Sequence, residues 1–292
     1  MRIFCINLDH RTDRRHYMEA QFEALGMTVE RIRATTPADI QAADLAPLTF
    51  EDARRRLMPT EIATSISHHR AWRRMLEEGD PIALILEDDC ELSPRLPAFL
   101  AAAEQEARLS GVIRIETRQI RQVLARRPAR SLGGVRLHQP LTWEWGAAAY
   151  LISADEARRI LASSRRFDLP IDDTMLSPAS PLHLHGRVLQ TVPALAFVPD
   201  EDVAHGSQPA SVRHSDAQEE RQARFRTEKP KRAMSKIMRE VGRIGNQVAD
   251  ARTYVRHWVF GRALAVPFAG GSAPVASTPR SEATYGTNDA AD

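Results

Sequence analysis

Short apolar runs of strand length alternate with longer amphipathic segments along the chain, and this alternation restricts the fold more than any other feature of the sequence. The runs RIFCINL, PIALIL, GVIRIE and GAAAYLIS have the composition of buried strands. Between the first two lies a helical pattern in which Met18, Phe22 and Leu25 share one face and Gly26 follows the last turn. The alternation predicts an α/β domain with a mostly parallel, mixed sheet flanked by helices.

Positive charge is concentrated near the C-terminus. The 292 residues carry a net charge of +2, but nine Lys or Arg residues between Lys229 and Arg262 face only two acids, so the stretch carries +7 and the rest −5. Apolar residues recur three and four apart there, which predicts a basic amphipathic helix. We expect a globular domain over 1–215, a linker over 216–230, this helix over 231–262 and a disordered tail over 263–292.

Three roles are open for the basic helix. It can dock on its own domain, associate with a second copy to form a homodimer, or contact an anionic membrane surface. Nucleic acid is not expected as a partner, because the basic residues are not regularly interleaved with aromatic ones.

The N-terminus and the cysteines indicate a compartment. Asn7 and Asp9 interrupt the first apolar run before it reaches the length of a signal-peptide core, and two cysteines, Cys5 and Cys90, give no disulfide framework. We expect a cytoplasmic protein, peripheral on the inner membrane if the basic helix binds lipid.

Three consecutive carboxylates, Glu87, Asp88 and Asp89, directly follow the apolar run ALIL. Ligands of α/β sheets bind beyond the carboxyl ends of strands, where these acids are expected. Like charges this close repel, and a bound cation would relieve the repulsion. Glu87 and Asp89 point the same way if the strand continues, and their hard oxygen atoms suit Mn²⁺ or Mg²⁺. The alternative is a solvated acidic turn. A receiver domain is excluded, since no aspartate that could accept a phosphoryl group occurs between Asp89 and Asp155.

Two segments carry residues suited to a nucleotide. Arg14 and the backbone N–H groups after the first strand are typical contacts of phosphate groups, with an ordinary surface arginine as the alternative. Ser67 and His68 lie at the start of an amphipathic helix that contains Trp72. His68 has the alternative of a packed helix histidine.

Two tryptophans, Trp143 and Trp145, precede the run GAAAYLIS. Tryptophan rings are flat apolar platforms that suit a sugar face, so we expect both to bind the acceptor. The alternative is that both are core aromatics.

The order of five segments resembles glycosyltransferase family 25, which includes bacterial lipooligosaccharide galactosyltransferases and collagen galactosyltransferases. These segments are INLDHRTDRR, EIATSISHHRAW, ALILEDDCEL, GAAAYLISADEARRIL and PIDD. The resemblance covers roughly residues 1–215. It implies a GT-A-like fold and transfer of a hexose, usually galactose, from a UDP-sugar with inversion. It also implies a glycan or glycolipid acceptor, such as lipooligosaccharide, and Mn²⁺ or Mg²⁺ at the acidic motif.

The resemblance assigns roles residue by residue. It implies metal ligation by Glu87 and Asp89. The donor-binding residues that it implies are Asn7, Leu8, Asp9, Arg14, Ser67, His68, Glu87 and Asp88. The chain departs from the family at Ala63-Thr64, where Gly-Cys is common, and at Gly146-Ala147, where Gly-Thr is common. The second departure removes a hydroxyl group and bears on the preference for the donor sugar.

An inverting transfer needs a base that takes the proton of the acceptor hydroxyl. Asp172 and Asp173 in PIDD are the candidates, with Asp172 preferred and Glu144 in reserve. The aspartate pair has a structural alternative, the acidic first turn of a helix.

Two other functions use similar residues. A metal-dependent phosphodiesterase also clusters acids, and His183 and His185 are the closely spaced histidines that could complete a two-ion site. The second alternative is a non-catalytic family member that acts as a binding module.

Overall fold

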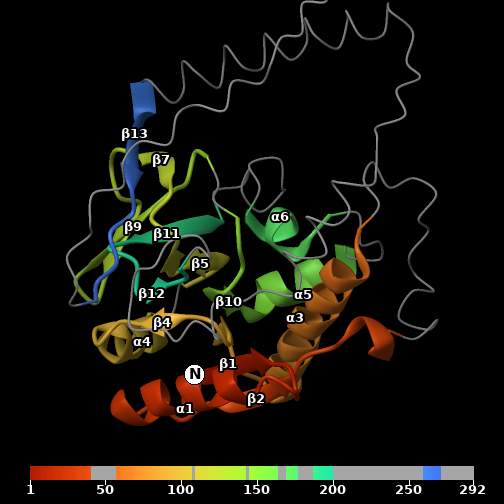
Figure 1. Cartoon of the computed structure of the whole chain (residues 1–292). Coiled ribbons are helices and arrows are strands. Elements are labelled where there is room, and N and C mark those ends of the chain that lie inside the picture. Colours follow the sequence, from red (N-terminus) through yellow and green to blue (C-terminus); the bar gives the residue numbers. More distant parts are fainter. Residues whose placement is uncertain are drawn as a thin grey trace, which may run out of the picture.

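The computed structural model describes residues 1–40, 57–106, 109–142, 145–163, 169–176, 187–199 and 259–270. An eight-stranded sheet of order β2-β1-β3-β10-β5-β11-β9-β8 lies at its centre (Figure 1). Its strands are β1 (Arg2–Asn7), β2 (Glu30–Arg33), β3 (Ile82–Glu87), β5 (Val112–Arg114), β8 (Arg130–Leu132), β9 (Val135–His138), β10 (Ala149–Ser153) and β11 (Val188–Val192).

Helices cover both faces of this sheet. One face packs against α1 (Thr12–Ala24) and α4 (Leu96–Gln105), and the other against α3 (Pro59–Glu77), α5 (Ala154–Ser163) and α6 (Ile171–Leu176). Each face of the sheet has its own hydrophobic core, and alternate residues of a strand point into different cores. In β3, Leu84 and Leu86 belong to the core beneath α1 and α4, and Ala83 and Ile85 belong to the core beneath α3, α5 and α6. A 3₁₀ turn, η1 (Pro37–Asp39), follows β2.

Two smaller sheets lie beside the large one. One contains β4 (Glu91–Leu92), β12 (Ala196–Phe197) and β6 (Glu116–Thr117), and the other pairs β7 (Arg121–Ala125) with β13 (Gly261–Ala265). Residues 118–134 contain both β7 and β8.

The α/β class and the mixed sheet between helices are confirmed. Parallel pairing joins β1 to β2 and β3, and β5 to β11, which makes three of the seven pairs of the large sheet; the rest are antiparallel. The antiparallel pairs arise because β10 runs against both of its neighbours and because β8 and β9 form a hairpin through two glycines of positive φ.

The pairing brings several chain segments to one edge of the sheet. Ile6 of β1 pairs with Glu87 of β3, so both strands end at that edge. Ala149 pairs with Leu86, which places the entrance of antiparallel β10 there too. Arg114, the last residue of β5, pairs with Tyr150, so the residues after β5 extend past the same edge.

The prediction for the C-terminal part is wrong at residues 261–270, whereas 259 and 260 are helical as expected. A helix was expected up to Arg262 and disorder from Ala263, but Gly261–Ala265 forms a strand paired with β7, and Val266 behind it is fully buried. Pairing with β7 explains the difference, because tertiary contacts override the weak local preference of this segment. The globular domain therefore includes residues well past 215, and the rest of the predicted helix, 231–258, lies outside the described residues.

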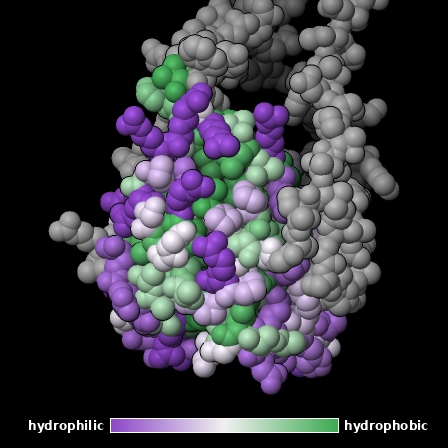
Figure 2. All heavy atoms as spheres, turned by 90° about the vertical axis from the view of Figure 1, so that its left-hand side faces the viewer, coloured by the Kyte–Doolittle hydropathy of each residue, from purple (hydrophilic) through white to green (hydrophobic). Residues whose placement is uncertain are grey.

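The outer face that carries β13 and α4 is mixed in character. Figure 2 shows hydrophilic residues over much of it, interrupted by small hydrophobic groups. Among the helices that the structure describes, none has the length and apolar character required to cross a bilayer. Cys5 and Cys90 are free and buried.

Gly111, directly before β5, provides a test of the strand packing. Its φ is +90°, and an added Cβ would lie 2.1 Å from the carbonyl oxygen of Arg187. Gly111→Ala is expected to lower the free energy of unfolding by at least about 3 kcal/mol, through backbone strain and a clash with rigid main chain. Gly26→Ala is the control, because Gly26 has φ +63° with nothing within 4 Å of a Cβ, and should cost about 1–2 kcal/mol. Equal losses in urea unfolding would contradict the packing at Gly111.

Candidate active site

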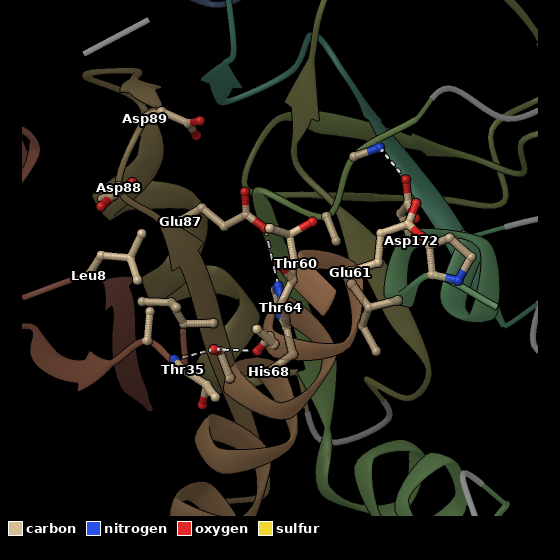
Figure 3. A pocket seen from close by; sticks show the side chains of 18 of the residues that line it. Leu8, Thr35, Thr60, Glu61, Thr64, His68, Glu87, Asp88, Asp89 and Asp172 are labelled. Atoms are coloured by element: carbon tan, nitrogen blue, oxygen red, sulfur yellow. Dashed lines mark hydrogen bonds and ion pairs between the residues drawn. The ribbon is translucent and has the colours of Figure 1, made fainter. Parts of the chain in front are cut away.

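A cavity of about 630 Å³ opens at the edge where β1 and β3 end. Its walls come from the residues after these strands, the N-terminal half of α3, the segment before β10, the turn after β6 and the start of α6. Figure 3 shows Asp88 and Asp89 on one side of the cavity, Asp172 on the opposite side, and Glu87 between them. The volume is in the range of small-molecule sites.

Asp88 is a buried anchor for the start of the chain. Its two carboxylate oxygens accept hydrogen bonds from Arg14 Nη1 at 2.9 Å and from Asn7 Nδ2 at 2.7 Å. Burial raises the pKa of Asp88, although the charge and hydrogen bond of Arg14 and the hydrogen bond of Asn7 oppose this. Asp88 therefore joins the end of β3 to the end of β1 and to α1.

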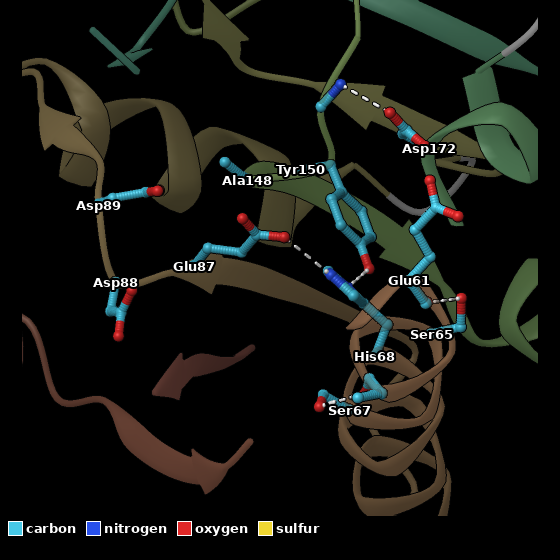
Figure 4. A network of polar contacts seen from close by, with 12 residues as sticks. Glu61, Ser65, Ser67, His68, Glu87, Asp88, Asp89, Ala148, Tyr150 and Asp172 are labelled. Carbon is cyan, nitrogen blue, oxygen red and sulfur yellow. Dashed lines mark hydrogen bonds and ion pairs between the residues drawn. The ribbon is translucent and has the colours of Figure 1, made fainter. Parts of the chain in front are cut away.

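Glu87 is held by a chain of polar groups that runs through the core (Figure 4). Trp72 Nε1 donates to the Tyr150 hydroxyl at 3.0 Å, and the same hydroxyl lies 2.8 Å from His68 Nδ1. His68 Nε2 lies 3.2 Å from Glu87 Oε1. Trp72 can only donate, so every group finds a partner when Tyr150 donates to Nδ1 and the N–H of Nε2 donates to Glu87.

The direction of this chain of hydrogen bonds affects the charge of Glu87. Burial works to raise its pKa, but the hydrogen bond from His68 and the charges of Arg118 and Arg14 outweigh it and lower the pKa. Glu87 therefore stays a carboxylate, aimed into the cavity by a side chain that is itself fully buried.

Asp89 is the third member of the acidic group. Its Oδ2 lies 3.4 Å from Arg14 Nη1, farther than the bond of Arg14 to Asp88. Burial raises the pKa of Asp89 to about 6 in spite of Arg14, helped by the negative charges of Glu87 and Asp88. A cation beside Asp89 would relieve this.

The acids fit a divalent ion only as a partial set of ligands. In the part of the chain that the structure describes, no three Asp, Glu, His or Cys side chains are placed to hold a metal ion together. Glu87 and Asp89 supply hard oxygens, and Mg²⁺ or Mn²⁺ is commonly held by one or two carboxylates with substrate phosphates and water in the other positions. The pair fits an ion of that kind, with Asp88 excluded by its bonds to Arg14 and Asn7.

The helix α3 shapes the wall next to the acids. Ser67 Oγ donates to the Ala63 carbonyl at 2.8 Å and accepts from the Thr35 N–H at 2.8 Å, which fixes the segment after β2. Glu61, in the first turn, accepts from the Met58 N–H at 2.9 Å and caps the helix while lining the cavity. Ser67 is buried and its hydroxyl makes both of these bonds within the protein. Its role here is to hold the cavity wall formed by α3 and the segment after β2.

The opposite end of the cavity is formed by Asp172 and the segment before β10. Asp172 Oδ2 accepts from the Gly146 N–H at 3.1 Å, and Oδ1 accepts from the Asp173 N–H at 3.0 Å. Behind Gly146, the buried Glu116 accepts from the Ala148 N–H and from Arg114 Nε at 3.1 Å. The carboxylate of Asp172 is therefore fixed in orientation at the cavity wall.

Most of the predicted site residues lie around this one cavity. The lining contains Leu8, Arg14, Ser67, His68, Glu87, Asp88, Asp89, Trp145 and Asp172. Asn7, Asp9 and Asp173 are not part of it: Asn7 orients Asp88 from behind, and Asp9 pairs with Arg31 and Arg33 on the surface. Trp143 and Glu144 lie outside the described residues, as do His183 and His185.

The comparison with known families decides the classification. The family described as glycosyltransferase family 25 (LPS biosynthesis protein) matches residues 1–175, which include all five segments named above. The chain belongs to glycosyltransferase family 25. The match ends before residue 215, to which the resemblance in the sequence was expected to extend.

Individual relatives cover parts of the chain. A glycosyltransferase 25 family member of Drosophila pseudoobscura pseudoobscura is 33% identical over 114 residues, 36% of this chain and 18% of that protein. Lacto-N-neotetraose biosynthesis glycosyltransferase LgtE of Neisseria meningitidis serogroup B is 29% identical over 164 residues, 53% of this chain and 58% of LgtE. The chain thus spans less than two thirds of the length of each.

The structure adds residues to the site of this family member that the sequence did not indicate. Arg11 and Arg118 line the cavity with their positive charges, and Tyr150 fixes His68. Arg118 follows β5 by four residues, past the same edge of the large sheet, so the rule that ligands bind beyond strand ends could have drawn attention to it. Tyr150 gave no signal, because it lies inside an apolar strand.

Proposed function

We propose that this family 25 member transfers a hexose, galactose, from a UDP-sugar to a glycan acceptor, with inversion at the anomeric carbon. The observation that carries the proposal is one cavity with acids and arginines at one end and an oriented carboxylate beside Trp145 at the other. LgtE, by its name a glycosyltransferase of lacto-N-neotetraose biosynthesis, supports an oligosaccharide such as that of a lipooligosaccharide as the acceptor.

The donor is assigned to the end with Arg14 and the acids. A nucleoside diphosphate carries several negative charges, and a forked guanidinium such as that of Arg14 binds phosphate oxygens well. Glu87 and Asp89 would hold Mn²⁺ or Mg²⁺, which supplies Lewis-acid stabilisation of the charge on the leaving diphosphate. His68, Tyr150 and Trp72 keep Glu87 oriented for this task.

The acceptor is assigned to the other end. Trp145 is 63% exposed at the cavity and offers a flat face to a sugar ring. Asp172 is the base that takes the proton of the attacking hydroxyl, since it lines the cavity and Asp173 does not.

A donor screen tests the proposal. The full chain is incubated with UDP-galactose, UDP-glucose, UDP-N-acetylglucosamine and GDP-mannose, each with Mn²⁺ and with a chelator, and release of the nucleotide is measured. We expect release from a UDP-hexose, fastest with UDP-galactose, in Mn²⁺ alone. No release from any sugar nucleotide, together with Mn²⁺-dependent cleavage of bis(p-nitrophenyl) phosphate, would replace the proposal by a phosphodiesterase.

A further inference from the structure

The turn over residues 117–120 has an unusual backbone. Gln119 has φ 58°, and among the described residues it is the single non-glycine residue with positive φ. A glutamine in this conformation is uncommon, and such strain persists where surrounding contacts enforce it. The turn joins β6 to β7 and presents Arg118 and Ile120 to the cavity.

The contacts that enforce the turn come from Thr117 and the C-terminal segment. Thr117 is fully buried; its Oγ1 accepts from the Gln119 N–H at 2.9 Å and donates to the Val266 carbonyl at 3.0 Å. Just beyond the turn, β7 pairs along its whole length with β13. Both sides of the turn are thus attached to residues 261–270, here called the C-terminal strap, which lie past the family match.

The strap is itself fixed to the body of the domain. Ala194 donates from its N–H to the Pro267 carbonyl at 2.8 Å, and the Ala269 N–H donates back to the Ala194 carbonyl at 2.9 Å. Ser93 Oγ donates to the Ala269 carbonyl at 3.0 Å. Because the strap is fixed in this way, its contacts with Thr117 and β7 hold the turn in one position.

Arg118 uses this position to reach the middle of the site. It lines the same cavity as the three acids, and its charge lowers the pKa of Glu87. A Cβ on Gly146 would lie 3.4 Å from Arg118 Nε and 3.5 Å from Nη2, so the guanidinium packs on the glycine whose N–H orients Asp172. Arg118 thus lies within reach of both ends of the cavity.

We propose that Arg118 contacts the diphosphate of the donor opposite Arg14, and that Thr117 and the C-terminal strap are the device that positions it. The inference rests on the proposed function and identifies the group that the site recognises, a nucleoside diphosphate. Arg14 also pairs with Asp88 and Asp89, so a second guanidinium adds positive charge for the departing diphosphate that Arg14 supplies only in part.

The first test removes the positive charge of Arg118. UDP and inorganic diphosphate are titrated calorimetrically into the full chain in Mn²⁺. Arg118→Gln is expected to weaken both about 10- to 100-fold, since a charge-assisted contact is lost, and Arg118→Lys by less. Arg121→Gln is the control for a general loss of charge, because Arg121 is exposed on β7 and does not line the cavity. Equal binding by Arg118→Gln and Arg121→Gln would overturn the role of Arg118.

The second test addresses the positioning device without touching the ligand. Thr117→Val is expected to weaken UDP about tenfold because the turn is released, while Thr117→Ser keeps the hydroxyl and should bind like wild type. Thr142→Val is the control, since Thr142 Oγ1 accepts from the N–H of Val123 in β7 at 2.7 Å and lies outside the turn. It should lower the melting temperature as Thr117→Val does, but leave UDP binding unchanged. Loss of binding in Thr142→Val equal to that in Thr117→Val would contradict positioning through the turn.

Gln119 offers an independent pair of variants. Gln119→Gly removes the side chain but accommodates φ 58°, whereas Gln119→Val removes it and opposes that backbone conformation. We expect the glycine variant to retain UDP binding and the valine variant to lose it about tenfold. Identical binding by the two would refute the role of the strained turn.

The outcomes separate this inference from the proposed function. Wild type that binds UDP, with Arg118→Gln binding equally well, overturns the inference alone. Wild type that binds neither UDP nor inorganic diphosphate overturns both.

Discussion

Asp172→Asn is expected to lower the turnover number about 10²- to 10⁴-fold while the affinity for UDP stays within about twofold of wild type. The asparagine keeps a side-chain oxygen that can accept from the Gly146 N–H, so the cavity wall should hold its shape. It cannot take up the proton of an acceptor hydroxyl. The loss should therefore appear in the chemical step and not in donor binding.

The measurement is single-turnover transfer from UDP-galactose at saturating acceptor, with UDP binding determined on the same preparation. Asp173→Asn distinguishes the two neighbouring acids: Asp173 lies in the same turn of α6 but outside the cavity lining, so its effect should stay below about tenfold. An Asp172→Asn enzyme that turns over within about threefold of wild type would remove Asp172 as the base. Large and equal losses in both variants would indicate that the substitutions disturb helix α6, and would not identify Asp172 as the base.

The sequence predicted the parts of the site that lie directly at strand ends. The three acids follow a buried run, and the registers of β1, β3 and β10 place Arg14, Glu87 and the entrance of β10 at one edge, as the alternation of strands and helices indicated. Local pattern sufficed there because the direction of a parallel strand determines which of its ends faces the ligand.

The sequence could not predict which polar side chains support the site from behind. Asn7 and Ser67 look like ligand contacts in the chain, but both are occupied by bonds to Asp88, Thr35 and neighbouring backbone. Tyr150 shows the converse case, since a hydroxyl inside an apolar strand becomes meaningful only when α3 places His68 and Trp72 beside it. Such roles depend on contacts between residues far apart in the sequence.

The C-terminal strap was missed for a related reason. Residues 261–265 have the sequence GRALA, which lacks β-branched and aromatic side chains, so local propensity gave no strand. Pairing with β7 stabilises them, and that partner is more than 130 residues away in the chain. Only the folded structure shows that this segment belongs to the catalytic domain.

Asp89→Asn is expected to weaken Mn²⁺-dependent UDP binding by at least about 100-fold, because a direct ligand should matter at least as much as the outer partners of a metal site. Burial and the negative charges of Glu87 and Asp88 raise the pKa of Asp89 to about 6, and a bound cation would offset both effects, which makes Asp89 the main candidate ligand. Glu91→Gln is the matched control, since Glu91 lies two residues further on, in β4, and does not line the cavity. It should bind UDP in Mn²⁺ like wild type.

The titration of UDP into the wild-type chain, with Mn²⁺ and again with excess chelator, tests the central claim most directly. If Glu87 and Asp89 hold an ion that in turn holds the diphosphate, UDP should bind in Mn²⁺ and lose at least about 100-fold in affinity when the ion is removed. The Asp89→Asn chain should then show the same weak binding in both conditions. Binding by the wild type that is equally tight with Mn²⁺ and with chelator would contradict the account.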